Sequence, residues 1–288
     1  MERGGRAIVR LDLVTGLVVG LVLGVPAVAQ AGEEGRRKAP AAVTEPGPRL
    51  PVGRSQAVAQ ARSGLRRVYA VTESGLFVSD DGGRRWDRRG LPPAANADIL
   101  AIAVDPRDGQ RLYAGGRAGF WRSWDGGASW KALSPPALTR SGIRAIAVAP
   151  TVPETIYVGT DQEGVFRSPD GGVSWIPANR GLPEAFAGGR PALIRSLAVH
   201  PTNPDLAYAA TELHGLYRTT DAGVLWVPIN KGLGPFPLRW RTGGPRLLLD
   251  PLDPKRLGIR DPAGAFPSPP DEAFPECRWR RALAAARA

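Results

Sequence analysis

A fourfold internal repeat is the feature of this sequence that most constrains its fold. A box of the form Ser/Thr-x-Asp-x-Gly-x-x-Trp occurs as SDDGGRRW (79–86), SWDGGASW (123–130), SPDGGVSW (168–175) and TTDAGVLW (219–226). The box aspartates stand at positions 81, 125, 170 and 221, so the units are 44, 45 and 51 residues long. A period of this length indicates an array of similar units that pack on one another.

The segments around the boxes repeat as well, and each unit predicts four short strands. Upstream of three boxes stand ILAIAVDP (99–106), IRAIAVAP (143–150) and IRSLAVHP (194–201), each followed by a second strand such as IYVG and a third such as VFRS. A shorter version precedes the first box, and a fifth copy at 246–268 ends in PSPPDEAF where a box should stand. Short strands between Gly- and Pro-rich turns indicate an all-β protein. Four strands per unit at this period predict a β-propeller of four-stranded blades, with four intact units and a degraded fifth.

The box residues have the chemistry of a turn. An aspartate at a turn corner can accept hydrogen bonds from backbone N–H groups two residues on, a glycine takes positive φ at little cost, and a Ser or Thr hydroxyl bonds locally. We expect the tryptophan to open the outer strand and to pack between neighbouring units. The predicted structural set is Ser79, Asp81, Gly83, Trp86, Ser123, Asp125, Gly127, Trp130, Ser168, Asp170, Gly172, Trp175, Thr219, Asp221, Gly223 and Trp226.

The box and its surroundings resemble the Asp-box, or BNR, repeat. The variant here is most similar to the sortilin, xyloglucanase and photosystem II assembly-factor branch of the sialidase-like propellers. The resemblance covers about residues 55–268 and implies a propeller whose boxes lie on the rim, away from the ligand face. Those relatives bind or cleave very different things, so the resemblance is specific for architecture rather than for function.

The N-terminus has the order of a secretory signal peptide. Three arginines precede an apolar run from Leu13 to Val28, and two A-x-A patterns follow at 27–29 and 29–31. The sequence thus predicts a signal peptide (1–31), a flexible Pro-rich leader (32–54), the propeller (55–268) and an irregular tail (269–288). We expect the protein to be extracytoplasmic, secreted or periplasmic. The alternative is an uncleaved anchor, which is the one way in which we expect it to meet a membrane.

The composition limits the kinds of bond, site and partner that this chain can have. The single cysteine, Cys277, excludes an intrachain disulfide, and the two histidines match no zinc spacing, so we expect neither metal nor cofactor. The net charge is +11 and the cations are almost all arginine. No dense basic block is interleaved with aromatic residues, so we expect no nucleic-acid partner. A basic surface still attracts acidic partners.

Candidate binding residues come from the loops that form the ligand face of a propeller. Glu73, Asp161 and Glu212 stand in the turns between second and third strands, and Phe186 and Trp240 in the two long connections 179–193 and 230–244.

Two arginines add to these candidates. Arg144 and Arg195 occupy equivalent positions at the start of a first strand, which places them near the central opening. They could hold a carboxylate or phosphate through charge-assisted hydrogen bonds, or be neutralised by a loop acid of the same chain.

These residues favour a non-catalytic module that binds a protein or an acidic glycan. The alternative is a glycoside hydrolase of the sialidase or xyloglucanase kind, which needs two carboxylates facing one another across the bond. All five tyrosines belong to repeated strands, so none is left over as a nucleophile. A third interpretation is a truncated relic of a larger propeller.

The signal-peptide interpretation predicts the start of the mature chain. We expect N-terminal sequencing of protein purified from its native host to begin at Gln30 or Gly32, because cleavage follows the small residue of an A-x-A pattern. Recovery of the intact chain from Met1 in the cytosolic fraction would contradict export.

Overall fold

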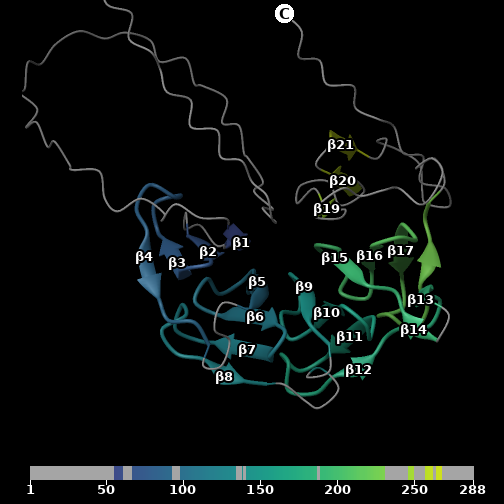
Figure 1. Ribbon diagram of the computed structural model, residues 1–288, viewed down its shortest axis with the longest axis horizontal. Helices are drawn as coiled ribbons and strands as arrows, with labels where there is room; N and C mark the ends of the chain where they lie inside the picture. Colours follow the sequence, from purple (N-terminus) through teal and green to yellow (C-terminus); the bar gives the residue numbers. More distant parts are fainter. Residues whose placement is uncertain are drawn as a thin grey trace, which may run out of the picture.

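The computed structural model describes residues 55–60, 67–92, 98–133, 138, 141–186, 189–230, 246–249, 257–261 and 264–267. The regular elements in these ranges are β-strands, gathered into five sheets and one two-stranded ribbon (Figure 1). Four sheets have four strands and the last has three. The predicted all-β propeller, with four intact units and an incomplete fifth, is therefore confirmed. The described residues include no helix that is long and apolar enough to cross a membrane.

The sheets, here called blades 1 to 5, follow one another along the chain, and every strand pairs antiparallel with its sequence neighbour. Blade 1 contains β1 (Ser55–Gln60), β2 (Val68–Thr72), β3 (Gly75–Ser79) and β4 (Asp87–Arg89). Blade 2 contains β5 (Ile99–Val104), β6 (Leu112–Gly116), β7 (Gly119–Ser123) and β8 (Lys131–Ala132). Blade 3 contains β9 (Ile143–Val148), β10 (Ile156–Thr160), β11 (Val165–Ser168) and β12 (Ile176–Pro177).

The second half of the chain adds two blades and a ribbon. The connection after blade 3, which the sequence suggests to be a loop, contains the ribbon β13 (Glu184–Phe186) and β14 (Arg190–Pro191). Blade 4 contains β15 (Ile194–Val199), β16 (Ala207–Thr211), β17 (Leu216–Thr219) and β18 (Val227–Pro228). Blade 5 contains β19 (Arg246–Leu249), β20 (Leu257–Asp261) and β21 (Gly264–Pro267).

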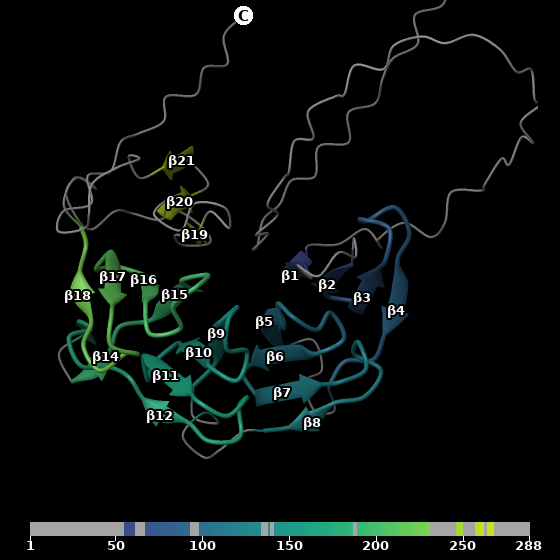
Figure 2. The ribbon, with the colours of Figure 1, turned by 180° about the vertical axis from the view of Figure 1, so that it is seen from behind.

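The blades stand around a common centre. The first strands β1, β5, β9, β15 and β19 face inward and contact one another in that order, while β4, β8, β12 and β18 lie at the periphery (Figures 1 and 2). The first strand of each unit is thus the innermost, as a propeller requires.

Glycine on the second strand lets neighbouring blades approach closely. A Cβ added at Gly159 on β10 would lie 2.5 Å from Cγ2 of Ile194, which belongs to the next blade, and a Cβ at Gly115 would lie equally close to Ile143. Both isoleucines are fully buried. The repeated strand-two glycine therefore receives an apolar side chain from the next innermost strand.

Tyrosine on the second strand ties blade 1 to blade 2 and blade 3 to blade 4, whereas the buried Tyr113 hydroxyl of blade 2 has no hydrogen-bond partner among the described residues. The Tyr69 hydroxyl donates a 2.9 Å hydrogen bond to the carbonyl oxygen of Gly109, and Tyr157 donates a 3.0 Å bond to that of Pro204. Burial raises the pKa of Tyr157 to about 12. These hydroxyls satisfy carbonyl groups of the next blade.

The box carboxylates bind their own turns. In the third box, Asp170 Oδ1 accepts hydrogen bonds from the backbone N–H groups of Val173 (3.0 Å) and Ser174 (2.8 Å), while Ser168 Oγ accepts one from Gly172 (2.8 Å). The donors to the carboxylate stand three and four residues on, not two as the sequence suggests. Gly171 and Gly172 have φ of 71° and 92°, and this left-handed pair turns the later N–H groups back to the aspartate.

The box tryptophans differ from one another in burial. Trp226 is 1% exposed, whereas Trp86, Trp130 and Trp175 are half-buried. Trp130 and Trp175 pack against clusters that include side chains of the preceding blade, as expected. The Trp226 indole N–H donates a 2.8 Å hydrogen bond to the Ala178 carbonyl oxygen of the preceding blade. The tryptophans also stand one residue before the outer strand and do not open it.

The outer strands are short and are poorly suited to pair with an additional strand. Strands β12 and β18 are two residues long, and each ends in proline, at Pro177 and Pro228, which has no N–H to donate. Strand β4 presents three exposed charged residues instead. Charge and proline are both features that protect sheet edges.

Acid should weaken the fold through the boxes. The Ser129 hydroxyl and backbone N–H both bind the Asp125 carboxylate, and these bonds lower its pKa to about 2. A carboxylate with a lowered folded-state pKa stabilises the protein at neutral pH, and this contribution is lost as pH falls from about 5 toward 2. We expect Asp125→Asn to reduce the loss of unfolding free energy between pH 7 and pH 2.5, measured by urea denaturation. An unchanged pH profile, equal to that of the exposed control Asp87→Asn, would contradict this.

Because the tryptophans are buried to different extents, their replacement should lower the free energy of unfolding by different amounts. Trp226→Ala removes a fully buried ring, which costs about 3–5 kcal/mol. We expect Trp86→Ala to cost clearly less, because solvent already reaches that ring. Equal losses in chemical denaturation would show that burial in the static structure does not determine their contributions.

Candidate functional site

Antiparallel pairing sorts the turns of each blade onto two faces. The turn between the second and third strands lies at one end of the sheet, and the box, between the third and fourth, lies at the other. The first strand begins at the end opposite the box, as the register shows: Ile143 at the start of β9 pairs with Thr160 at the end of β10. The face without the boxes therefore gathers the strand-one starts and the turns after the second strands.

A β-bulge recurs at the start of the first strand in all four intact blades. The register skips one residue between Ser55 and Ala57, Ile99 and Ala101, Ile143 and Ala145, and Ile194 and Ser196. Bulges re-aim side chains and are common beside functional sites. The skipped residues are Gln56, Leu100, Arg144 and Arg195. The bulge belongs to the fold, but only blades 3 and 4 place a cation there.

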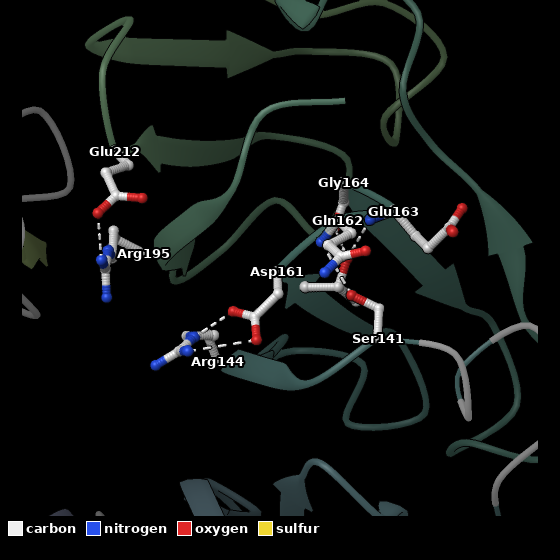
Figure 3. Close-up of polar contacts among 9 residues, drawn as sticks. Ser141, Arg144, Asp161, Gln162, Glu163, Gly164, Arg195 and Glu212 are labelled. Atoms are coloured by element: carbon white, nitrogen blue, oxygen red, sulfur yellow. Dashed lines mark hydrogen bonds and ion pairs between the residues drawn. The ribbon is translucent and has the colours of Figure 1, made fainter. Parts of the chain in front are cut away.

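Each bulge arginine meets the acid of the turn in its own blade (Figure 3). Arg144 Nε and Nη2 donate to the two carboxylate oxygens of Asp161, the second bond being 3.2 Å long. Arg195 donates through Nη2 to Glu212 Oε1. Of the two alternatives that the sequence leaves open, the structure therefore shows neutralisation by loop acids of the same chain.

The four charged side chains remain partly accessible. The exposed fraction is 28% for the Arg144 side chain, 18% for Asp161, 24% for Arg195 and 39% for Glu212. Strands β9 and β15 are adjacent innermost strands, so the two pairs belong to neighbouring positions near the centre. We call these four residues the arginine–acid face.

The turns that carry the acids are held by threonine and asparagine side chains that the sequence did not lead us to expect. Thr160 Oγ1 donates to the Gly164 carbonyl oxygen (2.9 Å) and accepts from the Glu163 N–H (3.0 Å). Asn179, which follows β12, accepts from the Val165 N–H (2.7 Å) and donates to the Glu163 carbonyl oxygen (2.9 Å). The asparagine thus closes the turn from outside.

Blade 4 repeats the same device with Thr211 and Asn230. Thr211 binds the Gly215 carbonyl oxygen and the His214 N–H, and Asn230 binds the Leu216 N–H (2.7 Å) and the His214 carbonyl oxygen (3.1 Å). The recurrence of Asn-Arg/Lys-Gly-Leu at 179–182 and 230–233 is the sequence signal that could have revealed these asparagines.

Of the three remaining candidate residues, the structure describes the side chain of Glu73 alone. Glu73 is exposed in the turn of blade 1, opposite a bulge that carries Gln56 and no arginine. Phe186 lies on β13, but its side chain is outside the described part of the chain, as is the whole of Trp240. Within the described residues no group of three or more His, Cys, Asp or Glu side chains could hold a metal ion.

Comparisons with known proteins identify relatives by fold. The sequence matches no protein-family model and no curated protein. The structure is similar to that of an ancestral GH74 enzyme, with a TM-score of 0.57 and 16% identity over 82% of this chain and 39% of that one. It is also similar to a chain of the COPII outer coat vertex on membranes, with a TM-score of 0.59 and 11% identity over 77% of this chain and 60% of that one. A structure of YCF48 bound to D1 peptide gives 0.49 and 15%, over 79% and 66%.

The four-stranded blades, with the likeness to the ancestral GH74 enzyme and to the coat chain, define a class of protein, the β-propellers, and nothing narrower. The chain spans less than half the length of the GH74 enzymes that it matches. At such low identity the likeness concerns the fold alone. What this chain does has to be argued from its own residues.

Proposed function

We propose that this chain is an exported, non-catalytic propeller of the Asp-box type, which binds a protein or acidic glycan partner on the arginine–acid face. The observation that carries the proposal is a departure from the repeat. The boxes, bulges and innermost packing recur in every intact blade and serve the fold. Asn179 and Asn230, each of which closes the acid-bearing turn of its blade, are here called the asparagine brace. The bulge arginine, its acid and this brace occur together only in blades 3 and 4 of the described chain.

The brace supports a binding role for these two turns. Affinity is lost when flexible groups must be ordered on binding, so a pre-organised turn binds more tightly than a mobile one. Asn179 and Asn230 fix the backbone that carries Asp161 and Glu212, and the threonines fix it from inside. Guanidinium groups held in place near a propeller centre suit acidic groups of a partner.

The same geometry gives little support to a glycoside hydrolase. Such an enzyme needs one carboxyl group on each side of the scissile bond. Asp161 and Glu212 each face an arginine instead of one another (Figure 3). Tyr69 and Tyr157 are buried and engaged with carbonyl oxygens, which leaves them unsuitable as nucleophiles.

A binding screen tests the proposal. The mature chain, residues 32–288, is exposed to arrays of acidic glycans and acidic peptides at 50 mM and 300 mM salt. We expect binding that weakens at the higher salt concentration, because charged contacts are screened, and that is lost in the double variant Arg144→Gln/Arg195→Gln.

The control is the pair Arg84→Gln/Arg88→Gln, which removes two exposed cations from blade 1 and leaves the arginine–acid face intact. Equal affinity of the wild type and the Arg144/Arg195 double variant would exclude this face. Turnover of a sialoside or β-glucan, lost on replacing Asp161 or Glu212, would establish the hydrolase in place of our proposal.

A further inference from the structure

The two arginine–acid pairs are not equivalent. Arg144 is bound side-on, with Nε and Nη2 each donating to one oxygen of Asp161. Arg195 makes a single contact, from Nη2 to one oxygen of Glu212. Among the described residues, Arg144 has one guanidinium nitrogen without an acceptor and Arg195 has two. Side-on, doubly bonded pairs are the strongest that a guanidinium forms with a carboxylate.

One nitrogen of the Arg195 guanidinium that makes no hydrogen bond within the described part of the chain, Nε, is buried. It is shielded from solvent and has no hydrogen-bond acceptor among the described residues, as is also true of Nε in Arg111, Arg122 and Arg167, whereas Nε of Arg144 is satisfied. A buried donor without a partner is costly and is rare in proteins. The described residues of this chain therefore satisfy the guanidinium of Arg195 incompletely.

The acid partner of Arg195 is also the easier one to displace. Glu212 is 39% exposed against 18% for Asp161, and it holds the arginine by one oxygen. Glutamate has one more rotatable bond than aspartate, so its carboxylate can swing away while the braced backbone of the turn stays in place. Leu213, the next residue of that turn, is 41% exposed, where blade 3 has the polar Gln162.

We propose that Arg195 is the anion-receiving residue of the face, and that Glu212 is an internal counter-ion which a carboxylate or phosphate group of the partner replaces. This rests on the proposed binding function and makes it specific. Arg144, which is bound by both carboxylate oxygens of Asp161, forms part of the face but does not bind the ligand. A ligand oxoanion that takes the place of Glu212 bridges the two terminal nitrogens of Arg195, Nη1 and Nη2, and so makes the second hydrogen bond that Glu212 does not make.

Single variants separate the two arginines. The probe is a fluorescein-labelled hexaglutamate peptide, followed by fluorescence anisotropy at low salt. We expect Arg195→Gln to weaken binding about tenfold or more, because a charge-assisted hydrogen bond is lost, and Arg144→Gln to change it less than about twofold. Glu212→Gln should strengthen binding at least about threefold, since a competing charge is removed. Asp161→Asn should strengthen it less than Glu212→Gln does, and Asp87→Asn, on the exposed outer strand of blade 1, is the control that should leave binding unchanged.

A second measurement needs no peptide and reports on the guanidinium directly. Nitrogen-15 NMR spectra of the arginine Nε–Hε groups are recorded during titration with inorganic phosphate and, separately, with acetate, and the Arg195 signal is assigned by its absence in Arg195→Lys. We expect the Arg195 signal to shift and the Arg144 signal to stay. A response to phosphate alone identifies a phosphate site, and a response to both anions includes carboxylates. Thermal melting of each variant separates loss of binding from loss of folding.

The two proposals fail in different ways. Binding of the acidic probe that depends equally on both arginines, or that Glu212→Gln does not strengthen, overturns the assignment to Arg195 and leaves the binding function standing. An unmoved Arg195 signal with both anions overturns it as well. A shifted Arg195 signal with no binding of any acidic peptide or glycan overturns the proposed function instead, and leaves a site for a small anion.

Discussion

The structure depends on how closely the innermost strands of neighbouring blades approach one another. At Gly115 and Gly159 a side chain as small as a methyl group would collide with the isoleucine of the next blade. This contact sets the spacing of the blades at the centre, where five first strands contact one another in sequence. Tyrosine hydroxyls on the second strands β2 and β10 join blade 1 to blade 2 and blade 3 to blade 4 farther out. The positions of Arg144 and Arg195 follow from this packing, because both extend from first strands that it holds together.

Much of the fold could be predicted because it is encoded in repeats. The period, the strand patterns and the missing fifth box together predict four complete sheets and a shorter one. Details that depend on neighbours outside the unit were not predictable. The Trp226 indole donates to Ala178 of the preceding blade, whereas the Trp86 indole donates to Gly83 of its own box. The four tryptophans are equivalent in sequence and different in environment.

The candidate site also has a part that could be predicted from the sequence and a part that could not. Equivalent sequence positions revealed Arg144 and Arg195, and the turn acids were found from the strand pattern. Which acid meets which arginine could not be read from spacing, because it depends on the bulge that re-aims each arginine toward the turn of its own blade. The asparagine brace was overlooked although its motif repeats, since asparagine after a strand is common in ordinary turns. Phe186 and Trp240 remain predictions.

The short outer strands have a consequence for how such a chain can change in length. With proline at Pro177 and Pro228, blades 3 and 4 offer little to a further strand at their outer edges. Their flat faces, in contrast, are where other blades pack. Duplication or loss of a unit of about 45 residues, the repeat length typical of such propellers, therefore lengthens or shortens the row of blades and leaves the width of each blade unchanged. The number of units can vary during evolution without a redesign of the unit itself.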